Sequence, residues 1–199
     1  MPVPTVSAVI PTYNRLPLLL AAVESVRVQT FGEWELIVAD DGSTDGSAEA
    51  VEALGDPRIR VLRLPRTGSP AVARNAAVRA ARGEWVAFLD SDDRWLPRKL
   101  ELQLSAVRRA GARWSYTALV LVDEEGGPLP FRAGGFRAIS GHILPDLLAM
   151  RIGATMSTLM VSRALLEEVG GFDEALRMRA DLDLAFRLAA RAPVAAVES

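Results

Sequence analysis

Short apolar runs alternate along the first half of the chain with segments whose apolar residues recur at helical spacing. The predicted strands are Val6–Ile10, Leu36–Ala39, Ile59–Leu64 and Trp85–Leu89, and the predicted helices are Leu16–Val28, Ser47–Leu54, Ala71–Ala81 and Pro97–Ala110. Helical spacing is clearest in Leu16–Val28, where Pro17 also suits the first turn. Strands and helices that alternate in this way imply right-handed crossovers and a mainly parallel sheet with helices on both faces, which is an α/β fold.

The alternation weakens after residue 110. Trp114–Val122 and Thr158–Val161 are predicted strands, Asp123–Gly127 a turn, Pro128–Gly141 an irregular stretch that contains Gly134–Gly135, and Ala164–Val169 and about Ala180–Arg191 helices. The last run, Val194–Val197, resembles the start of another strand, so we expect the sequence to be cut short. Without an internal repeat or a low-complexity linker, we expect residues 1–199 to form a single domain.

Composition narrows the chemistry that is available. The chain of 199 residues has 23 basic and 25 acidic residues, and a formal net charge of −2 gives no overall field that attracts nucleic acid. It has no cysteine, which excludes disulfides, thiolate zinc sites and a cysteine nucleophile. A bound metal would therefore need oxygen ligands.

The first predicted strand begins almost at once, with no leader-like segment before it, and no apolar run approaches the roughly 20 residues that span a bilayer. We therefore expect a cytoplasmic protein, with peripheral attachment to the inner face of the membrane as an open alternative.

Polar residues follow three of the predicted strands at their carboxyl ends, where ligands bind in open parallel sheets. The segments are Pro11-Thr12-Tyr13-Asn14-Arg15, Asp40-Asp41-Gly42-Ser43 and Asp90-Ser91-Asp92-Asp93. Five neighbouring carboxylates repel one another and call for a cation or hydrogen-bond donors. Mg²⁺ or Mn²⁺, held by one or two carboxylates and by substrate phosphates, fits this pattern and would neutralise a diphosphate leaving group.

Five motifs in this order resemble those of the family 2 glycosyltransferases, and the resemblance extends from residue 5 to about 192. The motifs are Pro11-Thr12-Tyr13-Asn14-Arg15, Asp40-Asp41-Gly42-Ser43-Thr44-Asp45, Ala73-Arg74-Asn75, Leu89-Asp90-Ser91-Asp92-Asp93 and Gly170-Gly171-Phe172-Asp173-Glu174. The resemblance implies a GT-A fold, which is Rossmann-like, with a nucleotide-binding half at about 1–110 and a more irregular acceptor-binding half at about 111–199. It also implies a metal-dependent, hexosyltransferase-like enzyme that moves a sugar from a nucleotide-diphosphate donor, usually a UDP-sugar, to an acceptor hydroxyl with inversion at the anomeric carbon.

The resemblance also assigns roles by motif position. Pro11, Tyr13 and Asp41 would hold the nucleobase, Asp90 the ribose and Asp92 the metal. Two arginines, Arg15 and Arg74, would assist at the base or the diphosphate, although an ordinary helix start also explains Arg74-Asn75. The acceptor remains open among carbohydrate, lipid-linked and other hydroxyl compounds.

Inverting transfer needs a general base that takes the acceptor proton. In the family this base is the aspartate of a Glu-Asp-x-Asp-Leu segment, which corresponds here to Ala180-Asp181-Leu182-Asp183-Leu184 and implies Asp181, with Ala180 in place of the usual glutamate. Residues two apart lie on different faces of a helix, so only one of the two aspartates can face a site. Asp183 can pair with Arg187 four residues on, whereas Asp181 has only Arg177, four residues upstream, as a helical partner.

Other conspicuous residues receive plainer interpretations. Trp95 follows the acidic loop and is the best placed of the four tryptophans to contact a sugar, while Trp34 and Trp85 flank strands and are expected to pack in the core. His142 is interpreted as a surface residue, and Gly170-Gly171 as the C-terminal cap of a helix.

Three other functions compete with that of an active transferase. A nucleotide-sugar-binding domain without turnover is the main one, because Ala180 replaces the family's glutamate. A phosphoacceptor receiver domain is disfavoured because Lys99, the only lysine, falls within a predicted helix. A dinucleotide-binding oxidoreductase is disfavoured because no Gly-x-Gly-x-x-Gly follows the first strand.

Overall fold

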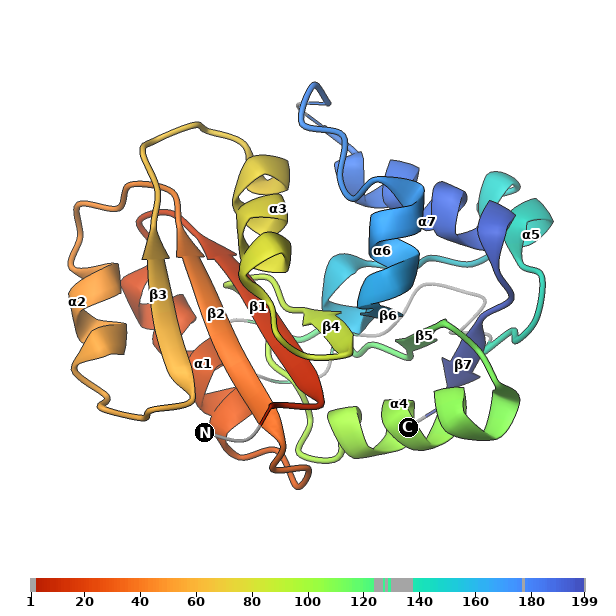
Figure 1. Cartoon of the computed structure of the whole chain (residues 1–199), viewed down its shortest axis with the longest axis horizontal. Coiled ribbons are helices and arrows are strands. Elements are labelled where there is room, and N and C mark those ends of the chain that lie inside the picture. Colours follow the sequence, from red (N-terminus) through yellow and green to blue (C-terminus); the bar gives the residue numbers. More distant parts are fainter. Residues whose placement is uncertain (1–2, 124–126, 128, 130–137, 177, 199) are drawn as a thin grey trace.

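A computed structural model describes residues 3–123, 127, 129, 138–176 and 178–198. Within these residues one seven-stranded sheet runs in the order β3-β2-β1-β4-β6-β5-β7 (Figure 1). The strands are β1 (Val6–Thr12), β2 (Trp34–Asp40), β3 (Ile59–Arg63), β4 (Trp85–Phe88), β5 (Trp114–Thr117), β6 (Met160–Ser162) and β7 (Ala195–Val197). The helices are α1 (Leu16–Arg27), α2 (Ser47–Glu52), α3 (Pro70–Ala80), α4 (Lys99–Ala110), α5 (Leu144–Leu148), α6 (Arg163–Val169) and α7 (Ala180–Arg191), with a 3₁₀ turn at Met156–Thr158.

The predicted mainly parallel α/β sheet is confirmed. β1 pairs in parallel with both β2 and β4, and β2 pairs in parallel with β3. Among the strands in the described residues, only β6 runs antiparallel to its neighbours, β4 and β5. β1 is longer than predicted because Pro11 and Thr12 continue the ladder opposite Ala39 and Asp40.

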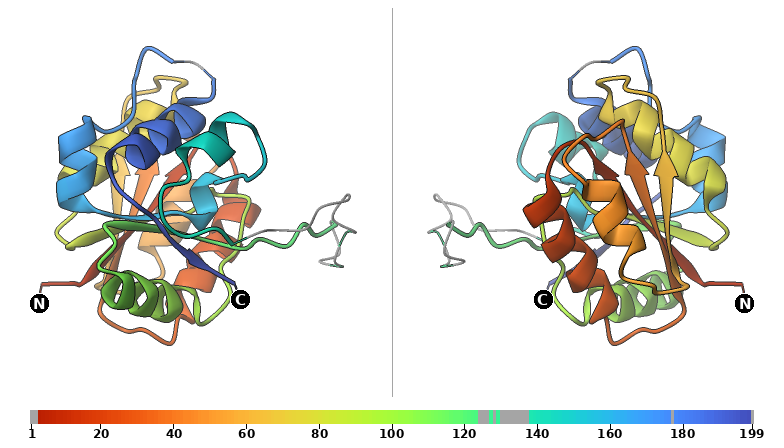
Figure 2. Two further views of the ribbon diagram at one scale, coloured as in Figure 1. Left: turned by 90° about the vertical axis from the view of Figure 1, so that its right-hand side faces the viewer. Right: turned by 90° about the vertical axis from the view of Figure 1, so that its left-hand side faces the viewer.

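Alternate residues of the central strands belong to two separate apolar clusters, one on each face of the sheet. Val9, Ile37 and Phe88 pack with residues of α3, α5, α6 and α7. Ala8, Leu36 and their alternating neighbours pack with residues of α1, α2 and α4. Figure 2 shows helices on both sides of the sheet. Every residue of β1 and β2 is buried, which explains why both strands are mostly apolar in sequence.

The second half differs more from the sequence prediction. β5 ends at Thr117 instead of Val122, because the chain leaves the body of the molecule there and Val120 and Val122 are exposed (Figure 2). The strand predicted from Thr158 begins at Met160, after the 3₁₀ turn. The short helix α5 was not predicted, because five residues carry too little periodicity to be recognised.

Several predictions fall on residues outside the described part of the chain. These include most of the turn at 123–127, most of the stretch 128–141 with Gly134–Gly135, and Arg177. Among the residues that are described, no helix has the length and apolar character needed to pass through a bilayer.

Candidate nucleotide-binding site

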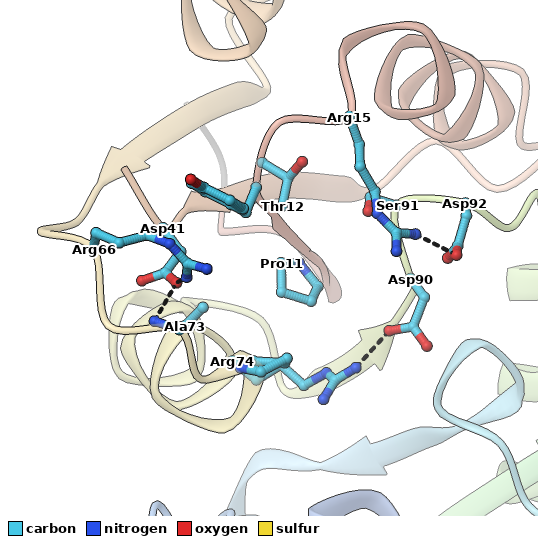
Figure 3. Close-up of a pocket in the computed structure, with 13 residues that line it drawn as sticks. Pro11, Thr12, Arg15, Asp41, Arg66, Ala73, Arg74, Asp90, Ser91 and Asp92 are labelled. Atoms are coloured by element: carbon cyan, nitrogen blue, oxygen red, sulfur yellow. Dashed lines mark hydrogen bonds and ion pairs between the residues drawn. The ribbon is translucent and has the colours of Figure 1, made fainter. Parts of the chain in front are cut away.

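A pocket of about 360 Å³ lies at the carboxyl ends of β1, β2 and β4 (Figure 3). The chain runs from β1 outwards to β2 and β3, and then returns through α3 to β4 on the other side of β1. Such a reversal of strand order opens a crevice in which open α/β sheets bind ligands. The lining residues are Pro11, Thr12, Tyr13, Arg15, Asp41, Arg66, Gly68, Pro70, Ala73, Arg74, Asp90, Ser91 and Asp92.

Seven of the eight site residues predicted from the sequence line this pocket. They are Pro11, Tyr13, Arg15, Asp41, Arg74, Asp90 and Asp92. The eighth, Asp181, is not among the lining residues. Of the five carboxylates expected at this edge of the sheet, Asp41, Asp90 and Asp92 line the pocket, and Asp40 and Asp93 do not.

Each of the three carboxylates in the pocket is paired with an arginine, as Figure 3 shows. The pairs are Arg66 with Asp41, Arg74 with Asp90 and Arg15 with Asp92. Guanidinium donors therefore provide the compensation that clustered carboxylates require. The three arginines come from different elements, namely the loop after β3, the middle of α3 and the start of α1.

Asp41 has the most complete set of partners. Its Oδ1 accepts hydrogen bonds from the backbone N–H and the hydroxyl of Thr67, both at 2.8 Å, and its Oδ2 accepts one from the Gly68 N–H at 2.8 Å and one from Arg66. Burial alone would raise the pKa of this carboxyl, but the donors on Thr67, Gly68 and Arg66 outweigh burial and lower it. Asp41 is therefore a buried, ionised acceptor.

Arg66 was not singled out in the sequence. Its guanidinium carbon lies 3.6 Å from the centroid of the Tyr13 ring, so the side chain stacks on Tyr13 while it pairs with Asp41. The rule used for the other strand ends would have found it, because Arg66 and Thr67 follow the carboxyl end of β3 at the same edge of the sheet.

Two buried polar atoms of pocket residues have no hydrogen-bond partner within the described residues. They are the hydroxyl oxygen of Thr12 and Nε of Arg74. An unpaired buried polar atom is costly, and such atoms are exceptions in folded proteins. Both residues line the pocket.

The loop after β4 is held by Ser157, which precedes β6. The Ser157 hydroxyl accepts a hydrogen bond from the Asp90 N–H at 3.0 Å and donates one to Asp93. Burial raises the pKa of Asp93, and the charges of Asp90 and Asp92 raise it further, against the effect of the Ser157 hydrogen bond. Asp93 thus anchors the loop that carries Asp90 and Asp92.

The first two motifs hold each other in place. Asn14, with φ of 50°, accepts a hydrogen bond through Oδ1 from the Thr44 N–H at 2.8 Å, and its own N–H donates to the Ser43 hydroxyl at 3.0 Å. Asp45 accepts from the Leu16 N–H at 3.0 Å and so satisfies a free donor at the start of α1. These residues fix the two loops that carry Tyr13, Arg15 and Asp41.

Asn75 connects the third motif to the fifth. Its Oδ1 accepts from the Phe172 N–H at 2.9 Å, and its Nδ2 donates to the Phe172 carbonyl at 2.9 Å and to Glu174 at 2.8 Å. The Phe172 ring meets the Phe88 ring edge to face at 5.3 Å. Since α3 begins at Pro70, Arg74 and Asn75 lie within the helix, and the interpretation of this pair as a helix start is wrong.

The two aspartates of α7 differ as their spacing predicted. Asp183 pairs with Arg187, whose Nη2 lies 2.6 Å from Asp183 Oδ2, so this predicted ion pair is confirmed. Asp181 lies in the first turn of α7, is partly buried, and has no side-chain partner among the described residues. The segment leading into α7 lies at the end of the molecule towards which the arrowheads of β1, β2 and β3 point (Figure 1).

The tryptophans belong to the core. Trp95 is 6% exposed, packs in the cluster beneath the sheet, and donates its ring N–H to the Ser157 carbonyl at 2.8 Å, so the suggestion that it contacts a sugar is wrong. Trp34 and Trp85 are buried as predicted. His142 is exposed, and Gly170 ends α6 in the left-handed conformation with φ of 83°, which confirms the predicted cap.

The pocket offers oxygen ligands of the kind that a divalent metal requires. Within the described residues, no group of three or more acidic or histidine side chains is arranged to hold an ion. The carboxylates of Asp90 and Asp92 face the pocket and supply the oxygen ligands that Mg²⁺ and Mn²⁺ prefer. The residues therefore fit a metal that shares its coordination with ligand phosphates, as the sequence suggested.

Comparison with known proteins identifies the family. Residues 7–165 match the sequence model described as Glycosyl transferase family 2. The chain belongs to glycosyl transferase family 2. An uncharacterised glycosyltransferase of Rickettsia felis is 33% identical to this family 2 chain over 194 residues, which are 97% of the chain and 31% of that relative. The UDP-Glc:alpha-D-GlcNAc-diphosphoundecaprenol beta-1,3-glucosyltransferase WfgD of Escherichia coli is 40% identical over 111 residues, which are 56% of the chain and 44% of WfgD.

Solved structures share the fold of this family 2 chain. Staphylococcus aureus TarS 1-349 in complex with UDP-GlcNAc superposes with a TM-score of 0.82 at 24% identity, over 96% of the chain and 55% of TarS 1-349. The mannosyltransferase PcManGT of Pyrobaculum calidifontis, in complex with GDP-Man and Mn²⁺, has a TM-score of 0.73 at 23% identity, over 98% of the chain and 55% of that structure. The fold is thus of the GT-A type, as predicted. The chain spans about a third to just over half of the length of these proteins.

Proposed function

We propose that this family 2 chain binds a nucleotide-diphosphate sugar, with UDP as its nucleotide, and transfers the sugar to an acceptor hydroxyl with inversion. The observation that carries the proposal is the pocket at the β1 and β4 strand ends, where an aromatic ring, three carboxylates and three arginines face one cavity. The pocket is of the size that small-molecule ligands use. WfgD is named for a UDP-Glc donor, and the TarS structure contains UDP-GlcNAc, which supports a UDP-sugar.

The roles proposed for the pocket residues are those that the family resemblance implies, and the chemistry of the side chains supports them. The Tyr13 ring and Pro11 offer an apolar face for the base, and ionised Asp41 is suited to accept a ring N–H. Asp90 is assigned to the ribose hydroxyls. Arg74 and Arg15 now pair with Asp90 and Asp92, and a bound diphosphate could replace these carboxylates as the partner of both guanidinium groups.

A divalent metal, when bound, would neutralise charge on the departing diphosphate, and Asp92 is the residue proposed to hold it. Asp92 is half-exposed and forms an ion pair with Arg15 at the pocket. The Mn²⁺ in the PcManGT structure supports a divalent ion, and it does not decide between Mg²⁺ and Mn²⁺ here.

We propose that Asp181 is the general base that takes the proton from the acceptor hydroxyl. A general base needs a carboxylate that is free to accept a proton, and Asp181 has no partner among the described residues, whereas Asp183 is committed to Arg187. The acceptor is proposed to be carbohydrate or lipid-linked, because WfgD is named for a diphosphoundecaprenol acceptor. Attachment to the inner face of a membrane is part of this proposal.

The test is turnover of UDP-sugars by Asp181→Asn, with Asp183→Asn as a matched control from the same helix. We expect Asp181→Asn to keep its Kd for UDP and to lose at least about a hundredfold in kcat, while Asp183→Asn stays within a few fold of the unaltered protein. Equal rates for all three proteins would exclude Asp181 as the base. An unaltered protein that binds UDP-sugars tightly and turns none over would instead support the binding domain without catalysis.

A further inference from the structure

We propose that Arg66 is an internal competitor of the nucleobase, so that its guanidinium must leave Tyr13 and Asp41 before a base can bind. The inference rests on the proposed function, because it takes Tyr13 and Asp41 as the base site. It adds a residue that sets both the affinity and the choice of base at that site.

The first observation is that Arg66 covers the aromatic surface that a base would use. Its guanidinium carbon lies 3.6 Å from the centroid of the Tyr13 ring, a separation typical of stacked planar groups. The Tyr13 side of the pocket is therefore already in contact with a flat, charged group. A base and this guanidinium cannot stack on the same face of the ring at the same time.

The second observation is that Asp41 has no acceptor site left. An ionised carboxylate offers about four lone-pair positions, and Asp41 receives four donors. Three of them come from Thr67 and Gly68, and two of these three are backbone N–H groups fixed by the loop. The fourth is Arg66, the one long side chain in the set. A ring N–H can reach Asp41 most readily by replacing Arg66.

The third observation is that the guanidinium can move while the loop stays in place. The Arg66 backbone packs closely against Gly42, where an added Cβ would lie 3.1 Å from the Arg66 nitrogen. The Arg66 side chain, however, is 46% exposed and has solvent into which it can turn. Displacement therefore needs a change of rotamer and leaves the three loop donors on Asp41 undisturbed.

This competition selects among bases. A base enters only when it replaces both contacts of Arg66, with a π face for Tyr13 and an N–H for Asp41. Uracil supplies both through its ring and N3–H. Cytosine presents a lone pair at N3, which would face the Asp41 carboxylate, and its only donor on that edge is the exocyclic N4 amine. A cytosine placed as uracil is placed would therefore repel Asp41 at N3, and it displaces the arginine less readily.

The experiment measures the Kd of uridine, cytidine and UDP by calorimetry for the unaltered protein, Arg66→Ala and Arg66→Met. Arg58→Ala is the matched control, because Arg58 stacks on Trp34 at 3.8 Å and pairs with Asp56 in the same way, outside the pocket. We expect the Kd of uridine to fall about tenfold in both Arg66 variants and to stay unchanged in Arg58→Ala, since removing the competitor raises the binding-competent fraction. Cytidine should remain weak in every protein.

Salt gives an independent readout. Uridine is uncharged, so added NaCl acts mainly by screening the Arg66–Asp41 pair. Added NaCl should therefore strengthen uridine binding to the unaltered protein and leave uridine binding to the Arg66 variants unchanged.

If the unaltered protein binds uridine or UDP and the Arg66 variants bind equally or more weakly, the competition is refuted and the proposed function stands. If no protein binds either ligand, both proposals fail. Arg66→Met retains the aliphatic stem and decides the matter if Arg66→Ala does not fold.

Discussion

The bridge between Asn75 and the Phe172 backbone offers the sharpest test of how the motifs support one another. Asn75→Ala removes three hydrogen bonds, each worth about 1 kcal/mol net, and leaves the N–H and carbonyl of Phe172 without their partner. Alanine has a higher helix propensity than asparagine, which offsets roughly 0.5 kcal/mol of this loss. We therefore expect Asn75→Ala to lower the free energy of unfolding by about 2–4 kcal/mol, and the melting temperature by roughly 10 °C.

Urea denaturation followed by circular dichroism measures this change, and two further variants sharpen it. Arg79→Ala is the control, because it removes an exposed 3.7 Å ion pair to the same Glu174 and should cost no more than about 0.5 kcal/mol. Asn75→Asp keeps the acceptor for the Phe172 N–H but places a carboxylate against the Phe172 carbonyl and Glu174, so it should cost at least as much as Asn75→Ala. A loss below about 0.5 kcal/mol in Asn75→Ala would refute the reasoning.

Three further predictions concern the core. Hydrogen bonds from Ser7 and Arg82 outweigh burial and lower the pKa of Glu35 in the folded protein. Ionised Glu35 therefore stabilises the fold above its ordinary pKa of 4.5, and this contribution is lost as the pH falls towards the folded pKa. Glu35→Gln should flatten the decline of the urea midpoint over that pH range, and an unchanged decline would contradict this prediction. The buried Lys99 amine contacts the face of the Trp95 ring, 3.7 Å from its centroid, and has no hydrogen-bond partner among the described residues. Burial lowers its pKa, so the unfolded state binds more protons and stability should rise with pH up to about 10.5. Lys99→Met should raise the free energy of unfolding at pH 7 by about 1–3 kcal/mol, and no change or a loss would argue against a buried amine. Gly83→Ala should lower the free energy of unfolding by about 2–3 kcal/mol, because the new Cβ would lie 2.7 Å from the Ser7 backbone nitrogen. An unchanged free energy of unfolding in urea denaturation would show that this contact relaxes.

Much of the sheet could be predicted because its strands are buried on both faces. β1, β2 and β4 are largely apolar runs, and six of the thirteen residues that line the pocket are polar residues that follow these strands. The rule that ligands bind at carboxyl strand ends needed only the order of elements. The fold of the first half therefore followed from local patterns.

The rest depends on contacts between distant segments. The strand-end rule would have placed Arg66 at this edge of the sheet, but nothing near it in the sequence indicates that the loop after β3 folds against Gly42 and brings the guanidinium onto Tyr13. Likewise, the bridge from Asn75 to Phe172 joins residues 97 positions apart. Trp95 looked available because it follows the acidic loop, yet its ring turns into the apolar cluster below the sheet.

The central claim is that the pocket between the ends of β1 and β4 binds a nucleoside diphosphate together with a divalent cation. The most direct test is calorimetry of UDP with Mn²⁺ and with EDTA, on the unaltered protein and on Asp92→Asn. We predict that Mn²⁺ lowers the Kd of UDP at least about tenfold in the unaltered protein, because the ion shares its coordination with the diphosphate, and that the gain is largely lost in Asp92→Asn. Absence of UDP binding to the unaltered protein, or an equal gain from Mn²⁺ in both proteins, would contradict the account.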